Sequence, residues 1–573
     1  MTAAQTKVGI IGAGPAGLVS ARWALKEGLD VTILERSNTV GGLWRPGGHT
    51  WPTMRTNVSK FCLSFMEFNH EMNPTEEALD PKKIFLTAKE MYEYLLKYAD
   101  NFNITPHVLL GHEVIEINQS YKNEKPGWKV KCRLMLDQTD KTKVGVEDFY
   151  FDKLIVASGN FSQPFIPIEL KEIIDNAKSK FAGTILHSIE YPSLFKNQSE
   201  VSSDKGISDK LEEIRLPFSS KNLLVIGNSN SSSEIIPDLA GVNKYNERKI
   251  TPAKKIYHLI RRPRYNCQKL SPAIGRGNKP FKLPVDFLLC ARINCQKPSK
   301  FDTPEERKMK YEFFSSMCCD QKKVMNAQLV PEFSPEHLPF FYATESFLDA
   351  AKCGIESGTY ETLLGEKIKE ITGNEVKFES GRSINCDMII ICTGFAQGFE
   401  ILFEPKILDC LEYEWKDNFQ QLILYKGTFR PGLENLAFIG MFQNTNFPLS
   451  EVQARWAAKV FAKKISFPNE GNPEVLNYIE EERAIRATPF AKRSITANCD
   501  FPILTDSIAR EFGACPDLNE MKGKDPELYE QLMNQPFLSC HFALVGPDAS
   551  PEWAKMTINT VKQYSEECKR LPC

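Results

Sequence analysis

The sequence lacks any long apolar run. A membrane-spanning helix needs about 20 consecutive apolar residues, whereas apolar stretches here end after a few residues, as Met388–Cys392 does. The first residues, Met1–Thr6, do not show the basic start of a secretory signal, and no lipidation motif is evident. We therefore expect no membrane span and a cytoplasmic location.

An excess of charge of one sign is also lacking. The 71 basic and 73 acidic side chains leave a formal net charge of -2. A chain without an overall positive field is not drawn to nucleic acid or to anionic lipid. We therefore expect no nucleic-acid partner.

The 16 cysteines include no Cys-x-x-Cys pair. Cys318 and Cys319 are adjacent, which suits neither a zinc site nor a thioredoxin-type redox pair. The sequence also offers no Ser-His-Asp set, no paired carboxylates and no cluster of metal ligands. We expect reduced cysteines and no metal site.

What is present is the composition of a soluble globular protein. Of the 573 residues, 42% are hydrophobic and 25% are charged, which excludes a disordered, fibrous or membrane-bundle protein. At roughly 100–200 residues per domain, the length suggests about three to five folding units.

The N-terminal segment predicts a β-α-β unit that binds a dinucleotide. An apolar strand is expected at Lys7–Ile11, a glycine-rich turn follows at Gly12–Gly17 (GAGPAG), a helix at Leu18–Lys26, and a second strand at Val31–Glu35. A lone G-x-G-x-x-G is a weak signal. Here the strand, turn, helix and terminal acid agree, so the unit is strongly indicated.

Each glycine of this turn has a physical role. Gly12 permits the tight turn, Gly14 lets the backbone approach a pyrophosphate, and Gly17 lets the helix pack closely on the strand. The helix N-terminus offers free N–H groups to the phosphates. Glu35 would accept hydrogen bonds from ribose hydroxyls and disfavour a 2′-phosphate, so this unit predicts FAD or NAD and not NADP.

A second unit of the same kind is expected in the middle of the chain. A strand at Leu223–Ile226 leads into Gly227–Ile235 (GNSNSSSEI), which keeps only the first glycine, and a later strand at Ile256–Ile260 ends in Arg261 and Arg262. Guanidinium groups at that position suit a 2′-phosphate, which favours NADPH. Two alternatives stay open: the arginines are a solvated basic face, or another Lys or Arg within 264–282 binds the phosphate.

Further along, Phe181–Pro192 (FAGTILHSIEYP) fits the pattern F-x-G-x-x-x-H-x-x-x-Y/W-P, and other motifs follow in a fixed order. These motifs are Gly41–Trp44, Thr56–Lys60, Ser158–Pro164, Cys392–Phe395 and Gln453–Ala458. In this combination the chain resembles the flavin-containing monooxygenases over residues 7–465, and more weakly beyond. Tyr191 is the form typical of heteroatom-oxidising members, whereas tryptophan is more typical of Baeyer–Villiger enzymes.

The two units and the resemblance together predict an α/β fold. We expect two Rossmann-like dinucleotide-binding domains, for FAD and NADPH, with the second inserted in the first, and a mostly helical C-terminal extension. The expected boundaries are 1–178 and 336–465 for the two segments of the FAD domain, 179–335 for the NADPH domain, and 466–573 for the extension. The apolar C-terminal anchor of mammalian relatives is missing, so peripheral attachment to the endoplasmic reticulum is only the alternative location.

The resemblance implies an oxidoreductase of known chemistry. NADPH would reduce FAD, reduced flavin and O2 would give a C4a-hydroperoxyflavin, and a small-molecule amine or sulfide would take the distal oxygen. A Baeyer–Villiger oxygenase acting on ketones is the alternative, and a non-catalytic flavin-binding protein is a more distant one. A homo-oligomer is possible, and no motif identifies the substrate.

Asn57 is the candidate catalytic residue, because the resemblance puts it near the flavin C4a edge and the nicotinamide. His187 and Tyr191 are expected to be structural. The resemblance and the two turns together predict the following cofactor-binding residues: Gly12, Gly14, Pro15, Ala16, Gly17, Glu35, Arg36, Gly42, Leu43, Trp44, Thr56, Asn57, Ser158, Gly159, Gly227, Ser229, Asn230, Ser231, Ser232, Arg261, Arg262, Thr393, Gly394 and Gln453.

Overall fold

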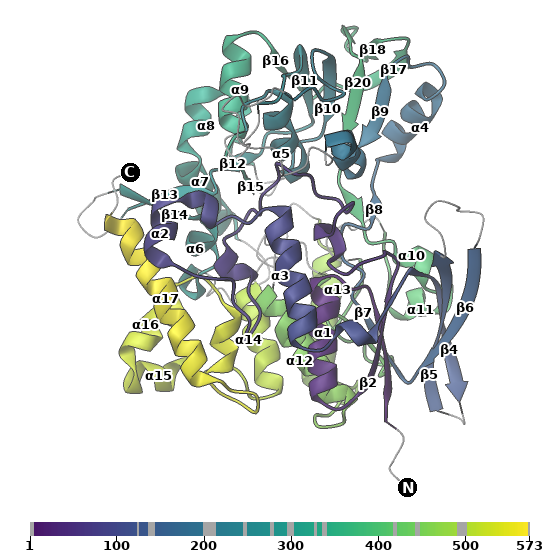
Figure 1. Cartoon of the computed structure of the whole chain (residues 1–573), viewed down its shortest axis with the longest axis vertical. Coiled ribbons are helices and arrows are strands. Elements are labelled where there is room, and N and C mark those ends of the chain that lie inside the picture. The colour runs from purple at the N-terminus through teal and green to yellow at the C-terminus, as the bar shows by residue number, and fades with distance from the viewer. Residues whose placement is uncertain are drawn as a thin grey trace, which may run out of the picture.

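Two parallel sheets form the centre of the molecule, one in each lobe of the computed structural model (Figure 1). The structure describes residues 5–122, 125–135, 144–198, 214–243, 249–274, 280–294, 303–325, 329–334, 341–415, 421–441, 447–489 and 501–570. The first sheet, in the lower lobe of Figure 1, has the order β22 (Leu436–Phe438), β7 (Lys153–Val156), β1 (Lys7–Ile11), β2 (Asp30–Glu35), β3 (Val108–Leu110). The second, in the upper lobe, has the order β16 (Tyr360–Leu364), β11 (Lys255–Ile260), β10 (Asn222–Ile226), β20 (Met388–Ile391), β9 (Thr184–His187).

Each sheet carries one of the two predicted β-α-β units at its centre. In the first, α1 (Pro15–Lys26) connects β1 to its parallel neighbour β2. Pro15 occupies the first helical turn, where its missing N–H costs nothing. In the second, α5 (Asn230–Leu239) connects β10 to β11, again in parallel register. Both units therefore fold as the sequence indicates.

The expected boundary between residues 335 and 336 does not agree with the strand pairing. Residues 336–465 were assigned to the FAD domain, but β16 pairs with β11, and β20 lies between β10 and β9 in the second sheet. The sequence of an apolar strand such as β20 is compatible with either sheet. Its place is decided by long-range pairing, in which Met388 lies opposite Leu223 of β10. The second domain therefore continues to the end of β20.

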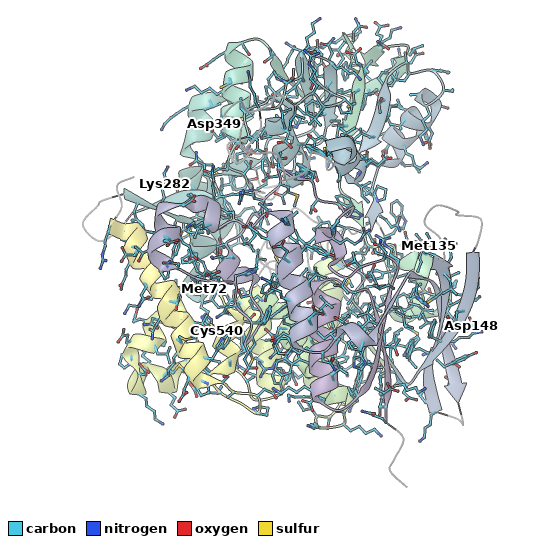
Figure 2. The ribbon with its side chains drawn as sticks, in the orientation of Figure 1. Met72, Met135, Asp148, Lys282, Asp349 and Cys540 are labelled. Atoms are coloured by element: carbon cyan, nitrogen blue, oxygen red, sulfur yellow. The ribbon has the colours of Figure 1, made fainter. Side chains whose placement is uncertain are left out.

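Smaller antiparallel sheets flank the two parallel ones. The first lobe carries β4 (His112–Lys122), β5 (Lys125–Met135) and β6 (Val144–Phe151), with Asp148 on the outer strand (Figure 2). The second lobe carries β17 (Ile368–Thr372), β18 (Glu375–Phe378) and β19 (Ser383–Asn385). The strands β8 (Gln163–Pro164) and β21 (Phe395–Ala396) pair where the chain passes between the lobes.

The described remainder is mostly helical. One group follows β11: the pair β12 (Tyr265–Cys267) and β15 (Phe341–Ala343), the hairpin β13 (Leu270–Ile274) and β14 (Pro280–Pro284), and the helices α6 (Val285–Leu289), α7 (Pro304–Met317), α8 (Cys319–Val324) and α9 (Phe347–Glu356). The other helices are α2 (Pro74–Leu79), α3 (Ala88–Asn101), α4 (Ile168–Ala177), α10 (Phe399–Leu402), α11 (Pro405–Cys410) and α12 (Phe447–Phe461).

The C-terminal extension is a set of helices packed on the first lobe, drawn in yellow-green and yellow at the lower left of Figure 1. It comprises α13 (Pro473–Ala487), α14 (Phe501–Glu511), α15 (Leu518–Lys524), α16 (Pro526–Asn534) and α17 (Pro551–Arg570). In the part of the chain that the structure describes, no helix combines the length and apolarity needed to cross a bilayer.

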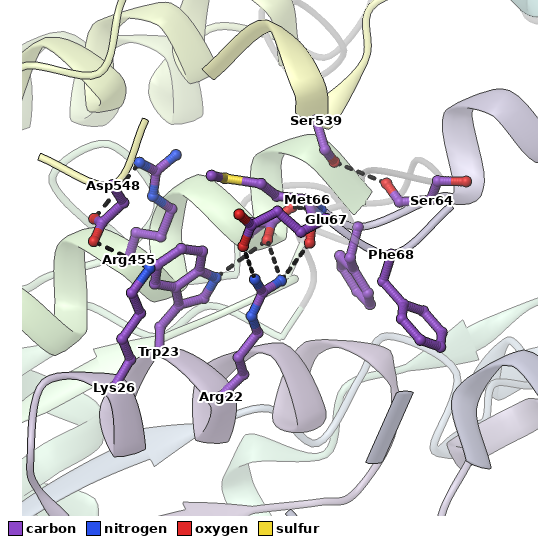
Figure 3. A network of polar contacts seen from close by, with 12 residues as sticks. Arg22, Trp23, Lys26, Ser64, Met66, Glu67, Phe68, Arg455, Ser539 and Asp548 are labelled. Carbon is purple, nitrogen blue, oxygen red and sulfur yellow. Dashed lines mark hydrogen bonds and ion pairs between the residues drawn. The ribbon is translucent and has the colours of Figure 1, made fainter. Parts of the chain in front are cut away.

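A buried polar network fixes this extension to α1 and α12 (Figure 3). Arg22 lies 2.8 Å from Glu67 and 3.6 Å from Glu451, and the indole N–H of Trp23 donates to Glu451 at 3.1 Å. Asp548 of the extension accepts from Lys459 of α12 at 2.9 Å. Apart from Glu67, whose side chain is exposed, these charges are buried as opposed pairs, so removing one partner would leave an uncompensated buried charge.

Candidate functional site

One large cavity of 2810 Å³ extends between the two lobes, at the carboxyl ends of the strands of both sheets. In open α/β sheets, ligands bind at this edge. All of the predicted cofactor-binding residues line the cavity except Gly17, Ser232 and Gln453. The sequence therefore identified groups that the fold brings together from segments far apart in the chain.

The three exceptions lie directly behind the cavity wall. A side chain on Gly17 would put its Cβ 1.9 Å from the carbonyl oxygen of Gly12, so this glycine permits helix–strand packing, as expected. Gln453 is fully buried in α12, where it accepts from the N–H of Gly440 at 3.1 Å and donates to Thr428 Oγ1 at 2.9 Å. Because Gly440 lines the cavity, Gln453 supports the wall and does not face the interior.

The first turn is closed by the acid at the end of β2. Glu35 is 5% exposed, and its two carboxylate oxygens accept from the backbone N–H groups of Ala13 and Ser37, each at 2.8 Å. Each oxygen keeps a second lone pair, so the carboxylate can still accept from a ribose hydroxyl. Glu35 thus stabilises the turn, and this structural role is compatible with its expected role in binding a ribose.

The space beside this turn fits FAD. Gly14 and Gly42 approach so closely that a Cβ on Gly42 would lie 2.9 Å from the Cα of Gly14, so the backbone itself forms the cradle. Ser158 Oγ is buried, has no hydrogen-bond partner among the residues that the structure describes, and belongs to a residue that lines the cavity. A buried hydroxyl without a partner costs free energy that a ligand can recover.

The second turn uses hydroxyl groups where the first uses glycine. Gly227 adopts φ +117°, and a Cβ there would lie 2.3 Å from the carbonyl oxygen of Cys392. Ser232 is fully buried; its hydroxyl donates to the carbonyl of Ser229 at 2.9 Å and accepts from the N–H of Ser229 at 3.0 Å. The serine that replaces the third glycine therefore stabilises the turn from within.

The arginines that end β11 reach the cavity. Arg261 and Arg262 are both exposed and line it, and the backbone carbonyl of Arg262 accepts from the side-chain amide of Asn228 at 3.0 Å. Arg264 lines the cavity as well. Of the other basic residues considered within 264–282, Lys269 is buried in an ion pair, Lys282 is exposed but does not line the cavity, and Arg276 and Lys279 lie outside the described residues.

The candidate catalytic residue lies at the same cavity. Asn57 is half-buried and lines it, between buried Thr56 and buried Ser59. The residues expected to be structural do not line it: His187 is 4% exposed with its ring edge-on to Phe395 at 5.2 Å. Burial lowers the pKa of His187 below its ordinary value, which keeps the ring neutral.

Three buried charged residues support the segment that carries Asn57, and sequence reasoning singled out neither of the two acids among them. Asp238, Lys269 and Asp286 are each no more than 1% exposed and contact the chain around Asn57. The signal that could have found two of them is a lone acid within an apolar run: IIPDLAG around Asp238 and LPVDFLL around Asp286. Among the described residues, no group of three or more His, Cys, Asp or Glu is placed to hold a metal ion.

Comparison with known structures supports the fold. A solved OTEMO complex with FAD and NADP matches with a TM-score of 0.57 at 17% identity, covering 88% of this chain and 98% of that one. Tmm from Pelagibacter sp. strain HTCC7211 matches with a TM-score of 0.54 at 18% identity, covering 92% of each chain. The expected architecture of two dinucleotide-binding domains is confirmed.

Comparison with known sequences covers nearly the whole chain. Mouse dimethylaniline monooxygenase [N-oxide-forming] 4 is 25% identical, over 94% of this chain and 84% of its own length. Human flavin-containing monooxygenase 3 is 25% identical, over 95% of this chain and 90% of its own length. The family model described as flavin-binding monooxygenase-like matches residues 5–245 and 358–571. The chain therefore belongs to the flavin-binding monooxygenase-like family and is a flavin monooxygenase.

Proposed function

We propose that this enzyme oxygenates a soft nitrogen or sulfur atom of a small molecule, using FAD, NADPH and O2. The observation that carries the proposal is the single cavity that joins the two dinucleotide turns and has Asn57 in its wall. FAD would occupy the first turn and NADPH the second. When bound, these cofactors supply hydride transfer and the activation of O2.

The chain's own residues would bind the two dinucleotides and orient them. The N-terminal N–H groups of α1 would bind the phosphates of one dinucleotide, and Glu35 would accept from its ribose. Arg261 and Arg262 supply charge for the 2′-phosphate of the other. Asn57 offers an amide N–H, which donates a hydrogen bond without being an acid strong enough to protonate its partner.

Part of the cavity wall is apolar, which favours an uncharged substrate atom. Phe65 and Phe447 line the cavity with their rings stacked at 4.4 Å, and Val285 and Leu288 of α6 line it too. Apolar walls exclude water and disfavour a charged group. A sulfide or an unprotonated amine suits such a site, and Tyr191 is the form of the family pattern that goes with heteroatom oxidation.

The test is NADPH consumption with product identification, over sulfides, tertiary amines and cyclic ketones. We expect sulfoxide or N-oxide, and Asn57→Ala to lower the amount of product formed per NADPH consumed. A lactone or ester from a ketone as the main product would instead identify a Baeyer–Villiger oxygenase. Failure of NADPH to bleach the bound flavin without air would contradict catalysis of either kind.

We further propose a cytoplasmic location, which rests on the short apolar runs and on the described helices. Cell fractionation tests it: recovery only from a membrane pellet that needs detergent would contradict it. Light scattering on the purified enzyme would establish whether it forms the homo-oligomer considered above.

A further inference from the structure

The segment Trp51–Ser59 carries Asn57 and belongs by sequence to the first lobe. Its own lobe holds it at Thr56, whose N–H donates to the carbonyl of Leu86 at 2.8 Å and whose hydroxyl accepts from the N–H of Leu86 at 3.0 Å. On either side of Asn57, however, the segment is bonded to later parts of the chain. Asp238 of α5 lies in the second lobe, whereas Asp286 belongs to α6, whose Phe287 packs in the apolar core of the first lobe. The position of Asn57 thus depends on both lobes.

Before Asn57, the segment is bonded to a fully buried carboxylate of α5. Asp238 Oδ2 accepts from the indole N–H of Trp51 at 3.0 Å and from the hydroxyl of Thr53 at 2.5 Å. Asn243 donates to the other oxygen, Oδ1, at 2.8 Å. The Trp51 ring lies edge-on to Tyr191 at 5.1 Å and belongs to the apolar core of the second lobe.

After Asn57, the segment is bonded to a second buried carboxylate. Asp286 of α6 accepts from both donors of Ser59: Oδ1 from the N–H at 3.1 Å and Oδ2 from the hydroxyl at 2.5 Å. Between the two carboxylates, Lys269 donates to the carbonyl of Arg55 at 3.3 Å and pairs with Glu234 at 2.9 Å.

A buried carboxylate is tolerated only where hydrogen bonds replace its hydration. Asp238 accepts from two side chains of this segment, and the Ser59 donors contact both oxygens of Asp286, so two buried carboxyl groups, from α5 and α6, hold the segment at both ends. We propose that Asp238 and Asp286 are positioning residues that fix Asn57 at the cavity through Trp51–Ser59. The proposal rests on the function proposed above for Asn57.

Hydrogen exchange tests whether Asp238 and Asp286 hold the segment Trp51–Ser59 in place, without relying on activity. The FAD-loaded enzyme is compared with Asp238→Asn, Asp286→Asn and Ser59→Ala, and exchange is measured by mass spectrometry on peptides that cover 51–59. We expect exchange in this segment to be about tenfold faster or more in each variant, because each variant disrupts a hydrogen bond between the segment and a buried carboxyl group. Product formed per NADPH consumed should fall in parallel, with FAD content unchanged.

Glu451→Gln is the matched control. Glu451 is also a fully buried carboxylate that accepts from an indole and a backbone N–H, those of Trp23 and Met66, but it does not contact 51–59. We expect it to lower the melting temperature and to change exchange in 51–59 by no more than about twofold.

The outcomes separate this inference from the proposed function. If exchange in 51–59 is unchanged in both aspartate variants, or rises equally in Glu451→Gln, the positioning role is wrong. Asn57→Ala tests the other claim: it should leave exchange in 51–59 near that of the wild type and still lower product per NADPH. If Asn57→Ala stays fully coupled, the role proposed for Asn57 is wrong, whatever the exchange data show.

Discussion

The two β-α-β units differ in the residue that lies where the helix packs against the strand. At the third position of the turn, the first unit has Gly17, where a Cβ would lie 1.9 Å from the carbonyl oxygen of Gly12. The second unit has Ser232, whose side chain fits and bonds both backbone groups of Ser229. The glycine lets the helix pack closely on the strand, whereas the serine stabilises its turn with hydrogen bonds from its hydroxyl.

The difference continues along the two helices. Six residues after those positions, α1 has Trp23, which donates to Glu451, and α5 has Asp238, which accepts from Trp51. The first contact lies beside Arg22 and ties the lobe to α12 (Figure 3), whereas the second ties one lobe to the other. At this position the first unit therefore makes a contact within its lobe, and the second makes a contact with a segment that belongs by sequence to the other lobe.

The largest expected effect on stability comes from a substitution that disrupts the first turn. Gly17→Ala forces a clash with backbone that cannot move aside, so we expect a loss of about 3 kcal/mol or more in stability and little bound FAD. Thermal unfolding and the ratio of flavin to protein absorbance measure both. A Gly17→Ala enzyme that purifies with a full complement of FAD would contradict the packing role of this glycine.

The next largest effect is a change of stability with pH, which comes from the titration of Asp238. Burial raises its pKa from 3.8 to about 7, against the hydrogen bonds from Thr53, Asn243 and Trp51; Glu234 raises it further, and Tyr191 also faces it at 3.5 Å. An acid with a raised folded-state pKa makes the folded state lose stability as pH rises from the unfolded value to the folded one. Between pH 5 and 7, the wild type should therefore lose about 2 kcal/mol relative to Asp238→Asn.

Unfolding by denaturant at several pH values, with the variant as the reference, measures this slope. The free-energy difference between the two proteins should level off above pH 7, where the carboxyl is ionised in both states. A difference that does not change from pH 5 to 7 would mean that Asp238 keeps an ordinary pKa.

A smaller effect concerns the choice of nicotinamide cofactor at the second unit. Arg262→Ala should raise KM for NADPH by about tenfold and leave KM for NADH nearly unchanged, because a charge-assisted contact with a phosphate is lost. Arg261→Ala is the paired variant, with the smaller effect expected. Steady-state kinetics with both cofactors decide: if neither variant changes the NADPH/NADH ratio, Arg264 is the next candidate among the residues lining the cavity.

The sequence was most informative where the structure is local. Gly12–Gly17 and the strands beside it are contiguous, so their spacing alone predicted the first unit, and the same logic recovered the second despite its missing glycines. β20 was assigned to the wrong lobe, because its residues, MIII, are apolar in the same way as those of β7, KLIV, and the pairing partner lies far away in the chain.

The candidate site shows the same limit. The residues that line the cavity were found through motifs that chemistry constrains, as with Glu35 and Asn57. Asp238 and Asp286 were missed because their importance arises from burial against Thr53 and Ser59, which tertiary packing creates. Gln453 was found, but its side chain points into the supporting wall, a direction that no local pattern specifies.

The smallest expected effect comes from removing the Ser232 hydroxyl from the second turn. Ser232→Ala removes both hydrogen bonds to Ser229, so we expect stability to fall by about 1 kcal/mol. The same change frees the N–H of Ser229 at the start of α5, where a phosphate would bind, so the Kd for NADP⁺ should change by less than about threefold. Calorimetric titration gives the Kd and thermal unfolding the stability. A stability loss with nearly constant affinity identifies Ser232 as an internal brace of the turn, whereas a tenfold or greater loss of affinity would show that its hydroxyl contacts the dinucleotide itself.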